Sequence, residues 1–194
     1  MNTYTDTPNW LSAPPPKLEG LQKQWLFRPG ALTGGLRQLG IVEIRILKEC
    51  IQSLPYDEAG TCRQFASSPV WVREIIMSIN GIPAVAARSL TPLKASHGVW
   101  QGIRKLRTRP LADILYTDRA IVRSNFECGL VKRTMPIYNT LAKVLHPVPA
   151  KPTLARRSTF WKNGQPLLVT ECFLPAFWNE IIPAASQNKK QNVA

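Results

Sequence analysis

The chain of 194 residues has little of what metal, redox and covalent-catalysis sites require. It has two histidines and four cysteines, and the cysteines show no C-x-x-C spacing. A zinc site and a Ser-His-Asp or Cys-His catalytic set are therefore poorly supported. The cysteines indicate reduced thiols rather than a disulfide framework. Because the sequence contains neither a phosphate loop nor a G-x-G-x-x-G motif, we expect no metal, nucleotide or flavin cofactor.

Long apolar runs are also missing. No run approaches the roughly 18 residues of a membrane span, and the first ten residues have neither the basic nor the apolar region of a signal peptide. We therefore expect a cytoplasmic protein without a membrane span. The length and a hydrophobic content of 44% favour one globular domain. We assign residues 1–17 to a loose lead-in, 18–182 to the domain and 183–194 to a polar, disordered tail.

The formal net charge of +13 is typical of nucleic-acid binding proteins. However, the basic residues are spread along the chain, and no helix-turn-helix, zinc finger or RNA-binding motif accompanies them. The densest run, residues 104–109, is more typical of a solvated helix face. Attraction of a small dianion to a basic site explains the charge equally well. We therefore predict a small-molecule partner and no nucleic acid.

The most informative pattern is a pair of similar segments, residues 70–92 and 154–175. Each has an arginine seven residues before an Asn-Gly pair, a proline three residues after the Asn and another proline twelve residues after it. Asn-Gly between apolar runs is a strong signal for a two-residue hairpin turn, because both residues tolerate a positive φ. The sequence thus predicts two antiparallel hairpins.

The same turns predict which charged residues face each other. If each Asn-Gly forms a two-residue loop, Arg73 lies opposite Arg88, and Arg156 lies opposite Glu171. Like charges opposite each other are destabilising, so one interpretation is an anionic ligand beside Arg73 and Arg88. The other is an arginine–glutamate network that only closes the core. A bulge in either strand would change the pairing.

The rest of the chain alternates helical and extended patterns and predicts an α+β domain on a single antiparallel sheet. Both hairpins are apolar on both faces, so helices must cover the sheet, and a ligand would lie between sheet and helices. Helices are expected over residues 18–27, 31–39, 96–107, 110–116, 119–126 and 138–145, a strand over 41–51 and turns over 55–69.

Three sequence blocks, in order, resemble the chorismate–pyruvate lyase family. They read W-V-R-E-I-I…N-G-x-P…A-R-S-L-T-P, then T-R-P-L-A-D-I-L-Y, then A-R-R-S…G-Q-P-L-L-V-T-E-C-F-L-P, and the resemblance extends over residues 26–177. It implies cofactor-independent elimination of pyruvate from chorismate, giving 4-hydroxybenzoate for ubiquinone or plastoquinone synthesis. It also implies a single antiparallel sheet with helices packed on one side, and helical flaps over an enclosed ligand site.

The resemblance also implies roles for individual residues. Arg73 matches the arginine that holds the ring carboxylate, the backbone of Leu111 touches the ligand, and Glu171 meets the 4-hydroxyl. Arg88 matches a second arginine near a path or secondary site for the ligand. Leu32 stands where the family pattern has methionine. Arg73 and Glu171 are the expected catalytic residues, and all five are expected to bind substrate.

Two other interpretations stay open. The effector domains of some bacterial transcription regulators are similar in fold, but a sensor is expected to adjoin a DNA-binding module, and no winged helix fits before residue 18. An inactive pseudoenzyme that retains 4-hydroxybenzoate is the other. The stretch 127–155 is longer than in the family pattern, which affects the geometry of the flaps. For an active enzyme we expect a monomer that its product 4-hydroxybenzoate inhibits strongly.

Overall fold

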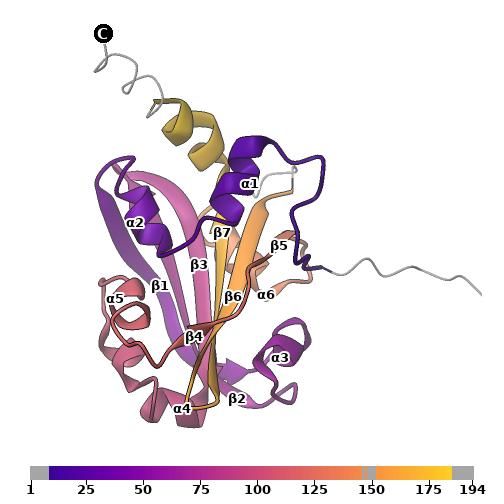
Figure 1. Ribbon diagram of the computed structural model, residues 1–194, viewed down its shortest axis with the longest axis vertical. Coiled ribbons are helices and arrows are strands. Elements are labelled where there is room, and N and C mark those ends of the chain that lie inside the picture. Colours follow the sequence, from indigo (N-terminus) through magenta and orange to yellow (C-terminus); the bar gives the residue numbers. More distant parts are fainter. Residues whose placement is uncertain (1–8, 146, 148–151, 185–194) are drawn as a thin grey trace, which may run out of the picture.

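A computed structural model describes residues 9–145, 147 and 152–184 and contains one antiparallel sheet (Figure 1). The strand order is β1-β2-β3-β7-β6-β4, and β5 also pairs with β6. The α+β class and the single antiparallel sheet are thus confirmed. The strands are β1 (Val42–Ser53), β2 (Pro69–Ile79), β3 (Ile82–Pro92), β4 (Val122–Arg123), β5 (Glu127–Leu130), β6 (Leu154–Lys162) and β7 (Gln165–Phe173).

Both Asn-Gly hairpins form as expected. In the turn between β2 and β3, φ is 50° at Asn80 and 81° at Gly81, and in the turn between β6 and β7 it is 49° at Asn163 and 72° at Gly164. Two consecutive residues with positive φ match a type I′ turn, whose twist suits an antiparallel hairpin. Because β3 also pairs with β7, the two hairpins lie side by side and form the centre of the sheet.

The register of the first hairpin corrects the sequence-based pairing. Ser78 still faces Pro83, but Met77 faces Val85, so Ala84 is an extra residue in β3. This bulge places Arg73 opposite Ser89 rather than opposite Arg88. Arg73 and Arg88 therefore lie on opposite faces of the sheet, since a shift of one residue exchanges the faces. In the regular second hairpin, Arg156 faces Glu171 as predicted.

Helices cover both faces of the sheet. On one face, α1, α2 and the π-helix η2 pack over Ile75, Met77 and Phe173, while α4, the 3-10 helix η1 and α5 pack over Trp71 and Phe160. The bounds are α1 (Gly20–Leu26), α2 (Leu32–Leu36), α4 (Leu93–His97), η1 (Gln101–Lys105), α5 (Ala112–Leu115) and η2 (Phe177–Ile181).

The opposite face is covered by α3 (Tyr56–Cys62) and α6 (Pro136–Ala142). The resemblance implied helices on one side of the sheet only, whereas the structure has helices on both sides. The physical reason is visible in the central strands, which are buried along nearly their whole length and so have two apolar faces to cover. In this described part of the chain, no helix is both long and apolar enough to cross a membrane.

Two local expectations are corrected. The helix expected over 96–107 is divided at Gly98 into α4 and η1. The helix expected over 119–126 does not form, because Val122 and Arg123 pair with Trp161 and Phe160 as strand β4. A short amphipathic segment gains little from helix formation alone, whereas the edge of β6 offers it backbone hydrogen bonds.

The segment before α1 is attached to the domain in its described part. Trp10 is buried, donates a hydrogen bond from Nε1 to Asp57 at 3.1 Å and lies 4.5 Å from the Arg157 guanidinium. Leu11 forms a two-way backbone bridge with Cys128. Residues 1–8 of the expected lead-in and 185–194 of the expected tail lie outside the described residues.

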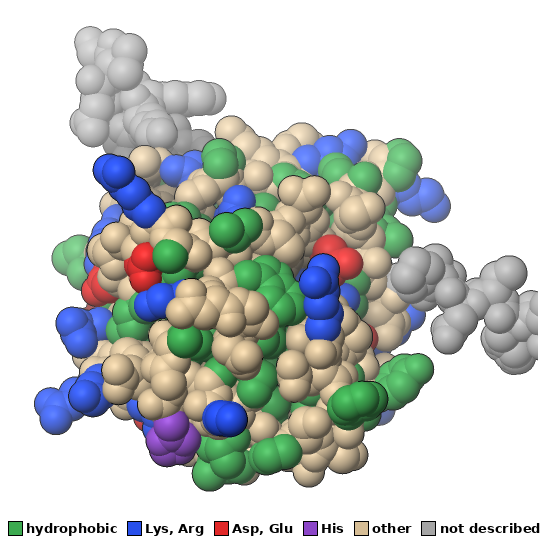
Figure 2. Space-filling model, turned by 60° about the horizontal axis from the view of Figure 1, so that its bottom comes forward, with side chains coloured by type: hydrophobic (Ala, Val, Ile, Leu, Met, Phe, Trp, Pro, Cys, Tyr) green, Lys and Arg blue, Asp and Glu red, His purple; other side chains and the backbone are tan. Residues whose placement is uncertain are grey.

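Basic side chains are distributed over the surface that Figure 2 shows. Lysines and arginines there alternate with hydrophobic and other residues and do not form a continuous stripe. This distribution matches the scattered positions of basic residues in the sequence, and it differs from the clustered face typical of nucleic-acid binding domains.

The four thiols differ in burial, and this generates a prediction. Cys62, Cys128 and Cys172 are buried, and burial raises the pKa of Cys62 to about 12, while Cys50 is only half-buried. Because the thiolate is the reactive species, we expect an Ellman titration of native protein to show one fast thiol, absent in Cys50→Ser, and four thiols in denaturant. Fast reaction of two or more native thiols would contradict this packing.

Candidate active site

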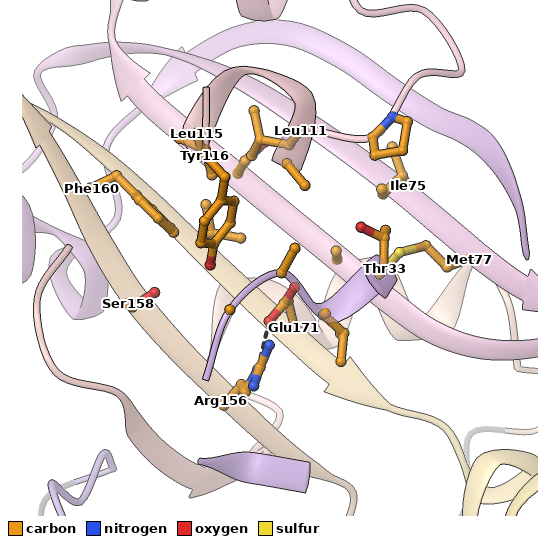
Figure 3. A pocket seen from close by; sticks show the side chains of 18 of the residues that line it. Thr33, Ile75, Met77, Leu111, Leu115, Tyr116, Arg156, Ser158, Phe160 and Glu171 are labelled. Atoms are coloured by element: carbon orange, nitrogen blue, oxygen red, sulfur yellow. Dashed lines mark hydrogen bonds and ion pairs between the residues drawn. The ribbon is translucent and has the colours of Figure 1, made fainter. Parts of the chain in front are cut away.

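A pocket lies between the two groups of helices on the face that carries Arg73 (Figure 3). Its empty volume is about 630 Å³, including the part open to solvent. The lining residues come from the start of α2, the strands β1, β2, β3, β6 and β7, the segment around α5, and β4 with the residues after it: Gly30, Ala31, Leu32, Thr33, Ile44, Arg73, Ile75, Met77, Ala87, Ser89, Pro110, Leu111, Ala112, Leu115, Tyr116, Arg123, Phe126, Arg156, Ser158, Phe160, Val169 and Glu171.

Strand pairing organises the floor of this pocket into two neighbouring rows. One row runs across the sheet through Arg73, Ser89, Val169 and Ser158, and the next through Ile75, Ala87, Glu171 and Arg156. Members of a row are direct cross-strand partners, and the two rows are two residues apart, so both face the same way. The register therefore brings Arg73 and Glu171 into one pocket from positions about a hundred residues apart in the sequence.

Two segments flank the rows. Leu32 and Thr33 come from the start of α2, and Leu111 stands directly before α5. Figure 3 shows α5 with Leu111 and Leu115 on one side of the pocket and Thr33 on another. Of the five residues expected to bind substrate, four line the pocket: Leu32, Arg73, Leu111 and Glu171.

The Arg73 guanidinium is buried and partly used by the protein. Its Nη2 donates hydrogen bonds to the carbonyl oxygens of Arg107 at 2.5 Å and Arg109 at 3.4 Å, and its Nε lies 3.3 Å from a carboxylate oxygen of Glu49. Burial lowers the pKa of Arg73, and the neighbouring Glu49 opposes that shift. Nη1 makes no hydrogen bond to a described residue, so it can donate to a ligand.

Glu171 forms an ion pair with Arg156 across β6 and β7, as the second hairpin predicted. Arg156 Nε donates to Glu171 Oε2 at 2.6 Å. Arg156 Nη1 also donates to the carbonyl oxygens of Trp25 and Arg28, both at 3.2 Å, and the guanidinium lies 4.3 Å from the Phe126 ring centre. The other oxygen of Glu171, Oε1, accepts no hydrogen bond from the part of the chain described, and so remains available to a ligand.

Sequence comparison identifies the class of this pocket. A family model described as chorismate lyase matches residues 6–182, which is nearly the whole chain. The chain belongs to the chorismate lyase family. A probable chorismate pyruvate-lyase from Bordetella pertussis is 58% identical over 171 residues, covering 88% of this chain and 90% of the relative. Probable chorismate pyruvate-lyase 1 from Pseudomonas fluorescens is 39% identical over 172 residues, covering 89% of this chain and 92% of that relative.

Structural comparison of this chorismate lyase family member agrees on the fold. The effector domain of PhnF from Mycobacterium smegmatis superposes with a TM-score of 0.51 at 12% sequence identity, covering 75% of this chain and 89% of that one. At this identity the likeness concerns the fold alone.

Three lining residues with ionisable side chains, Tyr116, Arg123 and Arg156, were not among the expected site residues. Arg156 was expected only as the partner of Glu171. Tyr116 ends the T-R-P-L-A-D-I-L-Y block, and Figure 3 shows its hydroxyl directed into the pocket. Burial raises the pKa of this hydroxyl, with the Arg123 guanidinium opposing the shift. Arg123 gave no signal in the sequence, because its segment read as a helix and its place depends on the pairing of β4 with β6.

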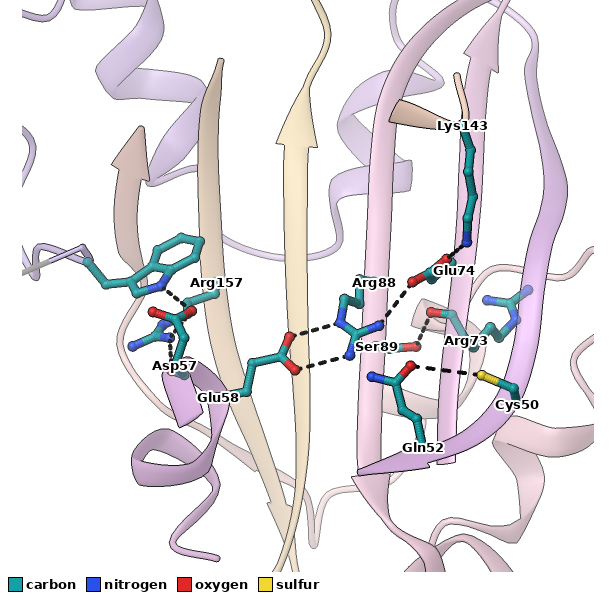
Figure 4. Close-up of polar contacts among 11 residues, drawn as sticks. Cys50, Gln52, Asp57, Glu58, Arg73, Glu74, Arg88, Ser89, Lys143 and Arg157 are labelled. Carbon is teal, nitrogen blue, oxygen red and sulfur yellow. Dashed lines mark hydrogen bonds and ion pairs between the residues drawn. The ribbon is translucent and has the colours of Figure 1, made fainter. Parts of the chain in front are cut away.

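Arg88 does not line the pocket of this chorismate lyase family member. It lies on the opposite face, where Nε and Nη2 donate to the two carboxylate oxygens of Glu58 at 2.9 and 3.1 Å, and Nη1 donates to Glu74 at 3.0 Å (Figure 4). Lys143 adds an ion pair to Glu74. The bulge at Ala84 thus turns Arg88 away from this pocket and into a buried ion network, and its expected contact with a ligand path or secondary site stays a prediction.

The pKa values of this network follow from burial and pairing. Burial raises the pKa of Glu58 more than Arg88 lowers it. At Glu74 burial also raises the pKa, but the cations Lys143 and Arg88 outweigh burial, so the net pKa lies below its ordinary value. Burial alone would lower the pKa of Arg88, yet the two carboxylates raise it.

We predict that Arg88→Met lowers the free energy of unfolding by about 3–5 kcal/mol, because it leaves two carboxylates buried without their main partner. Urea unfolding monitored by circular dichroism measures this change. Arg45→Met, at an exposed position on β1, is the control and should change stability by about 0.5 kcal/mol or less. Equal stability of the two variants would refute the structural role of Arg88.

Proposed function

We propose that this pocket binds chorismate and that the chain eliminates pyruvate from it, leaving 4-hydroxybenzoate. The relatives support this reading, since the one from Bordetella pertussis, named a probable chorismate pyruvate-lyase, is 58% identical over most of both chains. The observation that carries the proposal is the pocket floor. Arg73 and Glu171 stand in neighbouring rows, each with one polar atom that the described protein leaves unused.

The elimination of pyruvate from chorismate can proceed with an arginine and a carboxylate in the pocket and needs no external reagent. When the C4 proton of chorismate leaves, its electron pair enters the ring, and the C3–O pair departs with the enolpyruvyl oxygen. The ring becomes aromatic, and the released enolate takes up one proton on its methylene carbon to become pyruvate. Atoms and electrons balance in this step, so we propose catalysis without a cofactor. The protein then has to position the substrate and stabilise the charge that develops.

Each site residue receives a role in this proposal. Arg73 binds the ring carboxylate through Nη1, while its Nη2 bonds hold the chain at residues 107–109. Since that chain leads into α5, the same side chain positions Leu111, whose backbone contacts the ring. Glu171 accepts a hydrogen bond from the C4 hydroxyl through Oε1 and is the carboxylate of the pocket that moves a proton at that carbon.

Closure of the pocket is the second part of the proposal. Leu32 and Leu111 present apolar side chains from α2 and from the start of α5. With a ligand between them, these segments exclude water, and the exclusion strengthens the contacts to Arg73 and Glu171. Cytoplasmic location, a monomeric state and supply of a quinone pathway stay predictions from the sequence.

The direct test is incubation of the purified chain with chorismate. We expect 4-hydroxybenzoate and pyruvate in equal amounts, the first measured by its absorbance and the second by coupling to lactate dehydrogenase. Binding of 4-hydroxybenzoate without consumption of chorismate would instead indicate a sensor or a pseudoenzyme.

We predict that Arg73→Lys lowers kcat/KM for chorismate and weakens 4-hydroxybenzoate binding, each by about 10- to 100-fold, the cost of a charge-assisted hydrogen bond. An ammonium group cannot bond the two carbonyls of residues 107–109 and present a second nitrogen to a ligand, as the planar guanidinium does. Arg157→Lys, at a buried arginine on the opposite face, is the control. Near-normal kcat/KM in Arg73→Lys would remove Arg73 from carboxylate binding.

We predict that Glu171→Gln lowers kcat at least about 100-fold, the usual loss when a group that transfers a proton is removed. Steady-state kinetics and unfolding curves should be recorded together. Glu127→Gln is a matched control, because Glu127 also forms a 2.7 Å ion pair with a buried arginine, Arg157, but on the other face. If both variants lose stability equally and Glu171→Gln keeps its kcat, Glu171 has only a structural role.

A further inference from the structure

One charged group in the pocket has no role in the reaction as proposed. Arg123 lines the pocket from β4, and its Nη1 is buried yet makes no hydrogen bond to any residue that the structure describes. Buried donors in native proteins are nearly always paired, and the cost of leaving one unpaired is larger for a charged group. An unpaired guanidinium nitrogen at a pocket wall therefore points to a ligand that accepts from it.

The surroundings of Arg123 differ from those of the other pocket arginines. Arg73 has Glu49 beside it, and Arg156 is paired with Glu171. Arg123 has no ion pair with a carboxylate among the described residues; its guanidinium lies 4.0 Å from the Phe126 ring centre and within hydrogen-bonding reach of the Tyr116 hydroxyl, a neutral group, while Nη1 stays without a partner. An aromatic ring attracts a cation but does not satisfy its N–H donors. Arg123 is therefore the pocket arginine with the greatest unused capacity for an anion.

Its position is also distinct. Arg73 stands on β2 and Arg123 on β4, and three strands, β3, β7 and β6, lie between them. Glu171 is on β7, between the two arginines. The pocket thus has Arg73 on one side of the carboxylate that we assign to the C4 hydroxyl, and Arg123 on the other side, beyond Arg156, which is already paired with that carboxylate.

We propose that Arg123 binds the carboxylate of the enolpyruvyl group of chorismate. The inference rests on the proposed function, in which the ring carboxylate occupies Arg73 and leaves the second carboxylate of the dianion to be held. The second carboxylate departs with pyruvate and is absent from 4-hydroxybenzoate. Arg123 therefore binds the substrate but not the aromatic product, and it places positive charge beside the group that receives the C3–O electron pair.

This assignment predicts that a substitution of Arg123 affects the reaction of chorismate but not the binding of 4-hydroxybenzoate. Arg123→Gln should lower kcat/KM for chorismate about 10- to 100-fold, the cost of a lost charge-assisted hydrogen bond. Its dissociation constant for 4-hydroxybenzoate, measured by isothermal titration calorimetry, should stay within about threefold of wild type, because that ligand has no group for Arg123. Arg119→Gln, at an exposed arginine just before β4, should change neither value.

Arg123→Lys completes the test. It keeps a cation beside Phe126, so we expect kcat/KM for chorismate between those of wild type and Arg123→Gln. Binding of 4-hydroxybenzoate reports in each variant that the pocket is folded. Equal losses for chorismate and 4-hydroxybenzoate, or no loss for chorismate, would overturn the role of Arg123. Wild-type protein without lyase activity would instead refute the proposed function, and the two failures are distinguishable.

Discussion

Arg156 and Glu171 form a cross-strand ion pair in the centre of the sheet, and the elements around the pocket converge on it. The pair joins β6 to β7, reaches the carbonyl groups at the end of α1, and lies against Phe126 after β4. Placing a carboxylate on a largely apolar face is costly unless it has such a partner. The Arg156 guanidinium bonds to one carboxylate oxygen of Glu171 and leaves the other without a partner among the described residues. The same contact that stabilises the sheet therefore also fixes the position of the Glu171 carboxylate in the pocket.

The buried arginines on the two faces of the sheet differ in how completely they are paired. On the face under α3 and α6, Arg88 contacts two glutamates, and Arg157 contacts Glu127 and Asp57. On the pocket face, Arg73 and Arg123 each retain a nitrogen without a partner among the described residues. Since burial alone is similar for several of these side chains, the state of pairing, rather than burial, distinguishes a ligand-facing arginine from a structural one.

The sequence predicted much of this arrangement, and its failures have physical causes. Asn-Gly turns carry their conformation in two residues, so both hairpins and the pairing of Arg156 with Glu171 could be predicted. The bulge at Ala84 could not, because an alanine in an apolar strand has no local property that requires one. Strand β4 was missed for a related reason: its backbone bonds depend on the edge of β6, nearly forty residues later in the chain. The family blocks located Leu111 and Glu171 but gave no sign of Arg123.

The extra residue in β3 breaks an internal symmetry. Arg88 and Glu171 occupy the same place in two similar segments, eight residues after the Asn of the turn. With identical pairing in both hairpins, the two side chains would face the same way, and Glu58 and Glu74 would be left without the arginine that joins them. The similar sequences of the two segments therefore do not give equivalent side chains the same orientation in the sheet. One extra alanine in β3 thus gives the two related hairpins different roles: the first places Arg88 in the ion network under α3 and α6, and the second places Glu171 in the pocket.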